Sequence, residues 1–465
     1  MIRYLLPLAL IAAPAVAQEL SPAETAKIDA AVAESLQATG VPSASVAVVR
    51  GGRLVFAKAY GQQAPGWTSA RADAPYQIAS VSKQFTAAAL LLLQRDGKLS
   101  MDDKVSKYFP DISGADRITI RQLLSHTSGL QDYWPQDYSF AAMEKPTTPQ
   151  AIVDRWGKKP LDFDPGTQWQ YSNTGYVVAG MIAEKVGGAP LFDQLQRRVF
   201  KPLGITAYDQ DRAVGGKFPA GYHRFALGPV RFATPAAYGW LFAAGELAMS
   251  PSDLAKWNIA RIDRTLLTPA EWAEQENVVK LTNGGDTRYG LGVFVLDADP
   301  ASGRRRSIEH SGEAVGFLTQ NIVLPDEKVA ITVAVNADFG DAQGTIARKI
   351  ADTILPPRPE PEAAKTAQAR ALFTAMRAGT LDAKLMTENW NYFFTPQVAG
   401  DYRQSLSSLG EPSSFESVGP ARLRGGFVNR NYRITYPNGQ KLVAVTYAEP
   451  GDAGRYEQFL IYPAQ

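Results

Sequence analysis

The sequence predicts an α/β protein followed by a small α+β domain. Strand patterns occur near both ends of residues 18–355, and mostly helical patterns lie between them. A run of prolines and charges at residues 356–362 can continue neither a helix nor a central strand, which predicts a linker. Residues 363–465 are long enough to form the second domain.

The first strands of the sheet are predicted near the N-terminus. Residues 44–50 and 54–60 are rich in Val and Ala, and Gly51-Gly52 separates them, which predicts a β-hairpin. A helix is predicted directly after residue 83. The later strands are predicted at residues 289–296, 307–310, 317–324 and 329–335, before a helix at 345–355.

The C-terminal domain has its own pattern of elements. Helices are predicted at residues 363–378 and 396–409, and strands at 426–435, 440–448 and 454–463. This order loosely resembles an NTF2 or cystatin-like fold. The domain contains no histidine and no evident catalytic cluster.

The first 17 residues predict a secretory signal peptide. Arg3 precedes an apolar run that is too short to span a bilayer, and Ala15-Val16-Ala17 predicts cleavage before Gln18. The chain contains no cysteine, which excludes a lipid anchor at this site. We therefore expect a secreted or periplasmic protein without integral membrane contact.

Composition excludes several classes of function. The 48 basic and 46 acidic residues give a net charge of +2 without a long basic run, so no nucleic acid partner is expected. The absence of cysteine excludes a thiol nucleophile and disulfides. The three histidines, His126, His223 and His310, lack the spacing of a zinc site, so we expect no metal and no cofactor.

Ser80 and Lys83 place a hydroxyl and an amine one helical turn apart at the start of the predicted helix. A helix N-terminus favours negative charge on the serine oxygen. The amine can act as a base only if it is deprotonated, which burial would promote. A lone Ser-x-x-Lys motif is weak evidence, so its value depends on what accompanies it.

Two further motifs accompany Ser80 and Lys83. Tyr171 and Asn173 precede an apolar helix pattern, and His310-Ser311-Gly312 ends a short strand pattern downstream. In this order, the three motifs resemble those of the penicillin-recognising serine hydrolases, the class C β-lactamase and D,D-peptidase superfamily. The resemblance covers about residues 25–355 and includes stretches at 118–130, 244–257 and 289–292.

This resemblance implies a β-lactamase/transpeptidase-like antiparallel sheet flanked by helices, with a helical subdomain and the site between them. It implies that Ser80 is the nucleophile of an acyl transfer and that Lys83 and Tyr171 remove and relay its proton. Tyr171 would act as a general base or proton shuttle, with nearby positive charge favouring its phenolate.

The resemblance also implies the substrate-binding residues. Asn173 would donate its amide to the acyl substrate, Ser311 and Gly312 would line the site, and the backbone N–H groups of Ser80 and Glu313 would form the oxyanion hole. His310 stands where β-lactamases of this superfamily normally have lysine. We expect it to attract a substrate carboxylate mainly below about pH 6.5. This departure argues against an efficient β-lactamase.

Other candidate residues have plainer interpretations. His126 is expected to fix a loop, and His223 is expected to be exposed. Two aromatic loops can line an acyl pocket or pack in the core, and their residues are Tyr133, Trp134, Tyr138, Tyr238, Gly239 and Trp240.

We therefore expect an exported serine hydrolase whose partner is a small ester, amide or D-amino-acid peptide. The alternative within the superfamily is a β-lactamase or D,D-carboxypeptidase that acts on β-lactams or peptidoglycan stem peptides. An alternative of another class is a non-catalytic sensor that binds cell-wall peptides. The intact Ser80, Lys83 and Tyr171 favour an enzyme. The oligomeric state stays open.

Overall fold

The structure is a computed structural model that describes residues 19–134, 141–209, 218–298, 304–356, 363–451 and 453–464. The chain divides into two compact units, Met1–Asp297 with Arg306–Pro356, and Ala298–Arg305 with Pro357–Gln465. The predicted signal peptide, Tyr138 and residues 357–362 of the predicted linker lie outside the described residues. The division into a hydrolase domain, a linker and a C-terminal domain stays a prediction.

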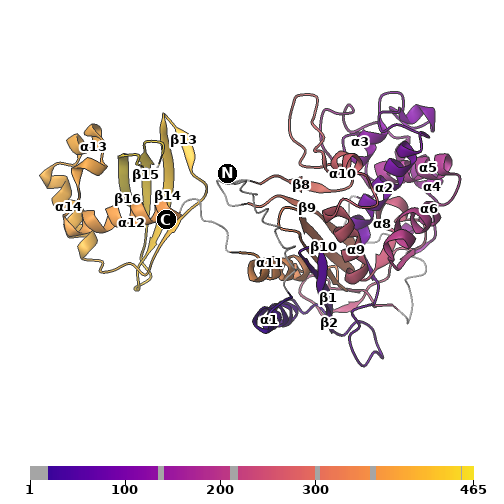
Figure 1. Cartoon of the computed structure of the whole chain (residues 1–465), viewed down its shortest axis with the longest axis horizontal. Coiled ribbons are helices and arrows are strands. Elements are labelled where there is room, and N and C mark those ends of the chain that lie inside the picture. Colours follow the sequence, from indigo (N-terminus) through magenta and orange to yellow (C-terminus); the bar gives the residue numbers. More distant parts are fainter. Residues whose placement is uncertain are drawn as a thin grey trace, which may run out of the picture. The chain divides into compact units, whose positions relative to one another are not determined.

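A six-stranded antiparallel sheet forms the centre of the first unit (Figure 1). Its order is β2-β1-β11-β10-β9-β8, so strands from both ends of the unit lie side by side, as predicted. The strands are β1 (Ser43–Arg50), β2 (Arg53–Gly61), β8 (Phe294–Leu296), β9 (Ser307–Ala314), β10 (Phe317–Leu324) and β11 (Val329–Val335).

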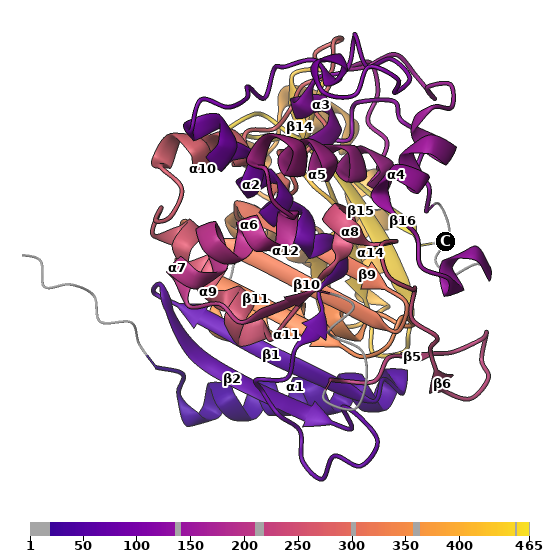
Figure 2. The same ribbon diagram turned by 90° about the vertical axis from the view of Figure 1, so that its right-hand side faces the viewer.

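Helices cover both faces of this sheet (Figure 2). Val46 and Val48 of β1 pack with α1 (Pro22–Thr39) and α11 (Ala342–Ile354) on one face. Ala47 and Val49 point to the other face, where they pack with Ala255 of α9 (Pro251–Ile262). Successive side chains of a strand point to opposite faces, so a strand buried on both faces reads as a continuous apolar run.

A helical subdomain forms the second half of this unit. Its centre is α2 (Lys83–Arg95), in which every residue from Lys83 to Leu93 is buried. Ala and Leu fill most of α2, and both favour helix. The surrounding helices are α3 (Ile120–Leu124), α4 (Pro149–Ile152), α5 (Asn173–Gly187), α6 (Leu191–Leu195), α7 (Lys201–Leu203), α8 (Phe242–Gly245) and α10 (Pro269–Glu276).

Two small sheets complete the first unit. The first has the order β3-β7-β4, and the second pairs β5 with β6. Their strands are β3 (Tyr76–Gln77), β4 (Ala207–Asp209), β5 (Tyr222–His223), β6 (Arg231–Phe232) and β7 (Leu247–Met249). Because β3 and β7 pair, the segments that lead into α2 and out of α8 lie next to each other.

A buried ion-pair cluster joins α9 and α10 to the start of α2. Arg261 donates to Glu276 at 3.0 Å, and their side chains are only 0% and 3% exposed. Arg264 and Arg306 bind the same carboxylate. Arg261 also donates to the side chain of Gln84, the residue after Lys83, at 3.1 Å. The cluster therefore holds the first turn of α2 in place.

Glu276→Gln is expected to lower the free energy of unfolding by about 3 kcal/mol or more, because it leaves the buried Arg261 charge without its partner. Urea unfolding measures this loss. The matched control is Glu34→Gln, which breaks an exposed pair with Lys349 and is expected to cost less than about 1 kcal/mol. Equal losses in the two variants would contradict a structural role for the buried cluster.

The second unit has helices followed by an antiparallel sheet, as predicted. The sheet has the order β12-β14-β15-β16, with β13 paired to β14. The helices are α12 (Ala363–Ala378), α13 (Glu388–Phe393) and α14 (Pro396–Ser407). The strands are β12 (Ser414–Ser417), β13 (Arg422–Arg424), β14 (Phe427–Thr435), β15 (Lys441–Ala448) and β16 (Tyr456–Pro463). Its likeness to NTF2 or cystatin-like folds stays a prediction.

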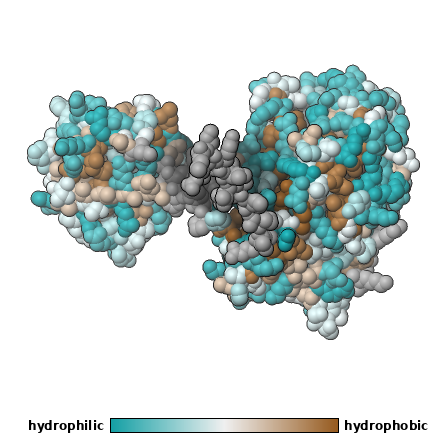
Figure 3. All heavy atoms as spheres, viewed as in Figure 1, coloured by the Kyte–Doolittle hydropathy of each residue, from teal (hydrophilic) through white to brown (hydrophobic). Residues whose placement is uncertain are grey.

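Each unit has its own apolar core. In the second unit, Phe373 and Trp390 from the helices pack with Tyr432 and Phe459 from the sheet. Figure 3 shows hydrophilic residues over most of the visible face of each unit, interspersed with smaller hydrophobic patches. Apolar surface of this extent is normal for a folded protein.

Candidate active site

Ser80 lies in a tight turn (Ala79–Ser82) between β3 and α2. Ala79 has a φ of +47°, a left-handed conformation that is costly for a residue with a side chain and that often occurs at functional sites. Gly312 of β9 allows the sheet to approach this turn, because a Cβ at Gly312 would lie 2.1 Å from the carbonyl oxygen of Ile78. The sheet thus packs directly against the serine.

Lys83 is buried at the first position of α2, and its ammonium has three acceptors. Nζ donates to Ser80 Oγ at 3.0 Å, to Asn173 Oδ1 at 2.8 Å and to the carbonyl oxygen of Ala244 at 2.7 Å. Burial lowers the pKa of Lys83 to about 7, although the Asp132 carboxylate opposes this shift. Near neutral pH, much of the amine is therefore uncharged and able to accept the proton of Ser80.

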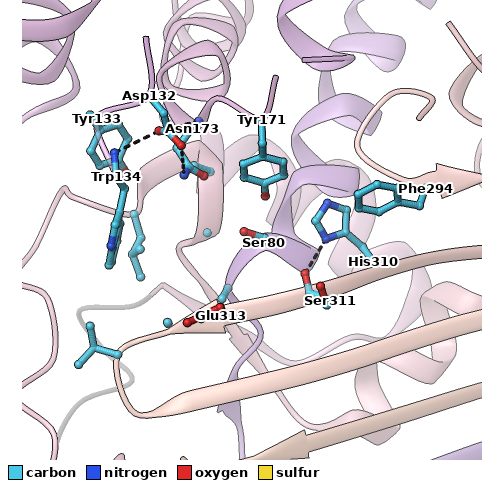
Figure 4. A pocket seen from close by; sticks show the side chains of 16 residues that line it. Ser80, Asp132, Tyr133, Trp134, Tyr171, Asn173, Phe294, His310, Ser311 and Glu313 are labelled. Atoms are coloured by element: carbon cyan, nitrogen blue, oxygen red, sulfur yellow. Dashed lines mark hydrogen bonds between the residues drawn. The ribbon is translucent and has the colours of Figure 1, made fainter. Parts of the chain in front are cut away.

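The hydroxyl of Tyr171 points toward Ser80 (Figure 4). Lys83 Nζ is 4.9 Å from the centroid of its ring. Its hydroxyl makes no hydrogen bond of normal geometry to any residue that the structure describes. Burial raises the pKa of Tyr171, Ser80 lowers it and Asp132 raises it further. The net shift is upward, so the expected phenolate is wrong, and a neutral phenol that relays a proton fits the site.

Asn173 occupies the first position of α5. Ser172 caps this helix by accepting from the N–H of Gly175, which fixes Tyr171 and Asn173 on either side of the cap. The Asn173 amide accepts from Lys83 and donates from Nδ2 to Asp132 Oδ2 at 3.2 Å. Both ends of the amide are therefore engaged within the protein.

Asp132 is a member of the site that the sequence interpretation missed. Its Oδ1 accepts from the backbone N–H groups of Trp134 and Asn173 at 3.1 and 3.0 Å. Burial raises the pKa of Asp132 to about 6, although these hydrogen bonds and Lys83 oppose the shift. The available signal was its place directly before Tyr133 and Trp134, in a loop already selected for its aromatic residues.

His310 is buried in β9, and both of its ring nitrogens have partners. The carbonyl oxygen of Ser311 can only accept, so Nδ1 carries the proton and donates to it at 2.6 Å. The Tyr289 hydroxyl then donates to Nε2 at 2.8 Å. Burial, with a contribution from Lys83, lowers the pKa of His310 to about 3. The expectation of a cation below about pH 6.5 is therefore wrong, because desolvation keeps the ring neutral.

A variant at His310 is expected to confirm this neutrality. For a carboxylate-bearing ester and a neutral ester, the ratio of kcat/KM should follow the same pH course in His310→Gln and in the wild type from about pH 5 to about pH 8. If His310 instead had its ordinary pKa, the wild-type kcat/KM for the anionic ester would rise relative to that for the neutral ester as pH falls. Such a gain, absent from the variant, would overturn the neutral assignment.

The remaining candidate residues are the other two histidines and the residues of the aromatic loops. His126 is buried, and its Nδ1 accepts from the N–H of Ser172 at 3.1 Å, which fits the expected loop-fixing role and supports the neighbouring Tyr171. His223 is only half-buried in β5. Tyr133 and Trp134 line the site, whereas Tyr238 is largely exposed.

These side chains surround a cavity of about 340 Å³ (Figure 4). Among the described residues, its lining contains two carboxylates, Asp132 and Glu313, and no lysine or arginine. Ser80, Tyr171, Asn173, His310 and Ser311 line the same cavity. The structure thus brings the candidate site residues together. Lys83 and Gly312 do not line the cavity themselves but lie next to residues that do.

Comparisons with known proteins agree with this geometry. A family model described as Beta-lactamase matches residues 28–354. Penicillin-binding protein 4* from Bacillus subtilis (strain 168) is 27% identical over 402 residues, which cover 80% of this chain and 87% of that protein.

Two of the similar solved structures are a D-stereospecific amidohydrolase and a D-amino acid amidase. The D-stereospecific amidohydrolase from Streptomyces sp. is 28% identical with a TM-score of 0.60, covering 71% of this chain and 98% of that one. The D-amino acid amidase from Ochrobactrum anthropi SV3, complexed with D-phenylalanine, is 25% identical with a TM-score of 0.62, covering 71% and 99%.

Proposed function

Because the chain belongs to the β-lactamase family of serine hydrolases, which act through an acyl-enzyme, we propose that it hydrolyses esters and small amides of D-amino acids. The observation that carries this proposal is the charge of the cavity. Among the described residues, the lining contains two carboxylates and no lysine or arginine. The similarity to a D-stereospecific amidohydrolase and to a D-amino acid amidase supports the same substrate class.

The proposed reaction begins with attack of Ser80 Oγ on the substrate carbonyl carbon. Lys83 takes the serine proton, and the Tyr171 hydroxyl relays a proton to the leaving alcohol or amine. The backbone N–H groups of Ser80 and Glu313 are the proposed donors to the oxyanion. Water then attacks the acyl-enzyme along the same proton path and releases the acid.

Charge decides between the candidate substrates. β-Lactams and D,D-peptides carry a carboxylate, and the described lining holds the carboxylates Asp132 and Glu313 but no lysine or arginine to bind it. An amide or ester of a D-amino acid with a free α-amino group carries an ammonium and no carboxylate, so it complements this lining. The β-lactamase or D,D-carboxypeptidase alternative is therefore the less supported one.

Substrates that differ in charge test the proposal. We expect kcat/KM for D-phenylalanine p-nitroanilide to exceed that for its N-acetylated form by about tenfold or more, and turnover of nitrocefin to be slow. Glu313→Gln should reduce the preference for the free ammonium. Glu309→Gln, on the same strand but outside the cavity lining, is the matched control. Faster hydrolysis of nitrocefin than of the D-aminoacyl substrate would overturn the proposal.

We further propose that residues 1–17 direct export and are then removed. The support is the order of Arg3, an apolar run and Ala15-Val16-Ala17. The mature chain should begin at Gln18. N-terminal sequencing of exported protein measures this directly, and material that begins at Met1 would contradict it.

Among the described residues, no helix combines the length and apolar character needed to cross a membrane.

A further inference from the structure

We propose that Asp132 is a positioning residue of the active site, which orients the Asn173 side chain and through it the Lys83 base. The inference rests on the proposed serine hydrolase chemistry. Asp132 touches neither Ser80 nor Lys83 by a hydrogen bond recorded in the structure, but it binds Asn173 at two points. Its effect on the proton transfer by Lys83 would therefore be indirect.

The hydrogen bonds give Asn173 only one favourable orientation. A carboxylate can only accept, so the Asn173 Nδ2 group must face Asp132, which leaves its Oδ1 to accept from Lys83 Nζ. A flipped amide would set its NH2 group against the ammonium and its oxygen against the carboxylate. Asp132 therefore determines which atom of Asn173 meets the base.

The same carboxylate joins two segments of the chain. It accepts from the backbone N–H of Asn173 at the start of α5 and from the N–H of Trp134 in its own loop. The loop after α3 is thereby fixed to the helix start that carries Tyr171 and Asn173. Loss of the carboxylate would loosen this connection as well as the amide.

Asp132 is also the charged neighbour that acts on Lys83 among the described groups. The ring of Tyr171 and the ring of Tyr176 lie 4.9 and 5.3 Å from Nζ, and both phenols have raised pKa values. His126 and His310 lie in the same cluster, and burial lowers the pKa of each, so both are neutral. The Asp132 carboxylate raises the pKa of Lys83 against the effect of burial.

Asp132→Asn separates these effects from simple structural support. Loss of the negative charge should lower the pKa of Lys83, so the acid limb of the pH profile should move to lower pH by about half a unit or more. Loss of the acceptor for Asn173 Nδ2 should lower the plateau rate by about tenfold or more, as loss of an outer hydrogen-bond partner does at metal sites. A purely structural residue would lower stability without moving the acid limb.

The measurement is the rate at which a neutral fluorophosphonate labels the full mature chain as a function of pH. Glu184→Gln is the matched control, because Glu184 is a half-buried carboxyl with a raised pKa that accepts a backbone N–H outside the cavity. The control should keep the wild-type profile. An unmoved acid limb in folded Asp132→Asn protein would overturn the proposal.

Two further variants complete the test. If Asp132→Asn does not fold, Asp132→Ser removes the charge without placing an NH2 group against Asn173, and the same shift of the acid limb is expected. In an Asn173→Ala background, Asp132→Asn should no longer lower the plateau, because the orienting effect acts through that amide. An undiminished loss in that background would contradict the positioning role.

Labelling also keeps this inference distinct from the proposed substrate class. A protein that is labelled normally but ignores D-aminoacyl substrates would refute the substrate proposal and leave the role of Asp132 intact. A protein whose Ser80 is never labelled would refute both.

Discussion

Ser80→Ala is expected to abolish turnover and covalent labelling by a fluorophosphonate while leaving the fold intact. The hydroxyl is the only nucleophile that the cavity places beside Lys83 among the described residues, at 3.0 Å from Nζ. It contributes little to the core, because Ser80 is only partly buried. Labelling on a gel and thermal unfolding measure the two expectations independently.

Ser82→Ala is the matched control for the nucleophile. Ser82 lies in the same turn, is buried and accepts from the N–H of Leu247 at 3.2 Å. Its loss should cost about 1 kcal/mol of stability and leave labelling in place. Activity of Ser80→Ala above about 1% of the wild type would move the nucleophile to another residue.

Lys83→Met is expected to reduce the rate of acylation by about a thousandfold or more, because it removes the base and keeps an unbranched side chain of similar length. In the wild type, the rate should rise with pH through about 7, where the buried amine loses its proton. Single-turnover acylation across this pH range measures both effects. A variant with more than about a tenth of the wild-type rate would assign the proton transfer to another group.

Lys83 also makes a prediction for stability. Its pKa is about 7 in the folded chain and 10.5 as the reference value, so the unfolded chain binds more protons between these values. The free energy of unfolding therefore gains a rising contribution between about pH 7 and pH 10.5, and Lys83→Met should lack it. Urea unfolding at several pH values tests the difference in slope between the two proteins.

Motif order was sufficient to select residues that the fold brings together around one cavity, because a serine hydrolase site places strong demands on local sequence. The Ser80 and Lys83 pair depends on helical spacing, and Tyr171 with Asn173 depends on the cap of α5. Asp132 could not be found this way. Its partner Asn173 lies 41 residues further along the chain, and no local periodicity links the two.

The charge states of the site were harder to predict than its members. The sequence interpretation assigned a charge to both His310 and Tyr171, whereas burial disfavours the charged form of each. Desolvation depends on the whole fold, so a short sequence motif does not reveal it. Two strand limits were also predicted wrongly. The strand predicted at residues 307–310 extends to Ala314 as β9. The strand predicted at residues 289–296 is reduced to β8 (Phe294–Leu296), because Gly292 has a φ of +80° and passes close to the carbonyl of Lys83.

The missing side chain at Gly312 has a consequence for engineering. Any larger residue there would collide with the Ile78 carbonyl and force β9 away from the serine. Substitutions at this position are therefore not expected to yield active variants. Its neighbours Ser311 and Glu313 have exposed side chains and line the cavity. Variants that accept new acyl groups are therefore best sought by substituting Ser311 and Glu313. Gly312 should be kept, because it maintains the distance between the sheet and the nucleophile.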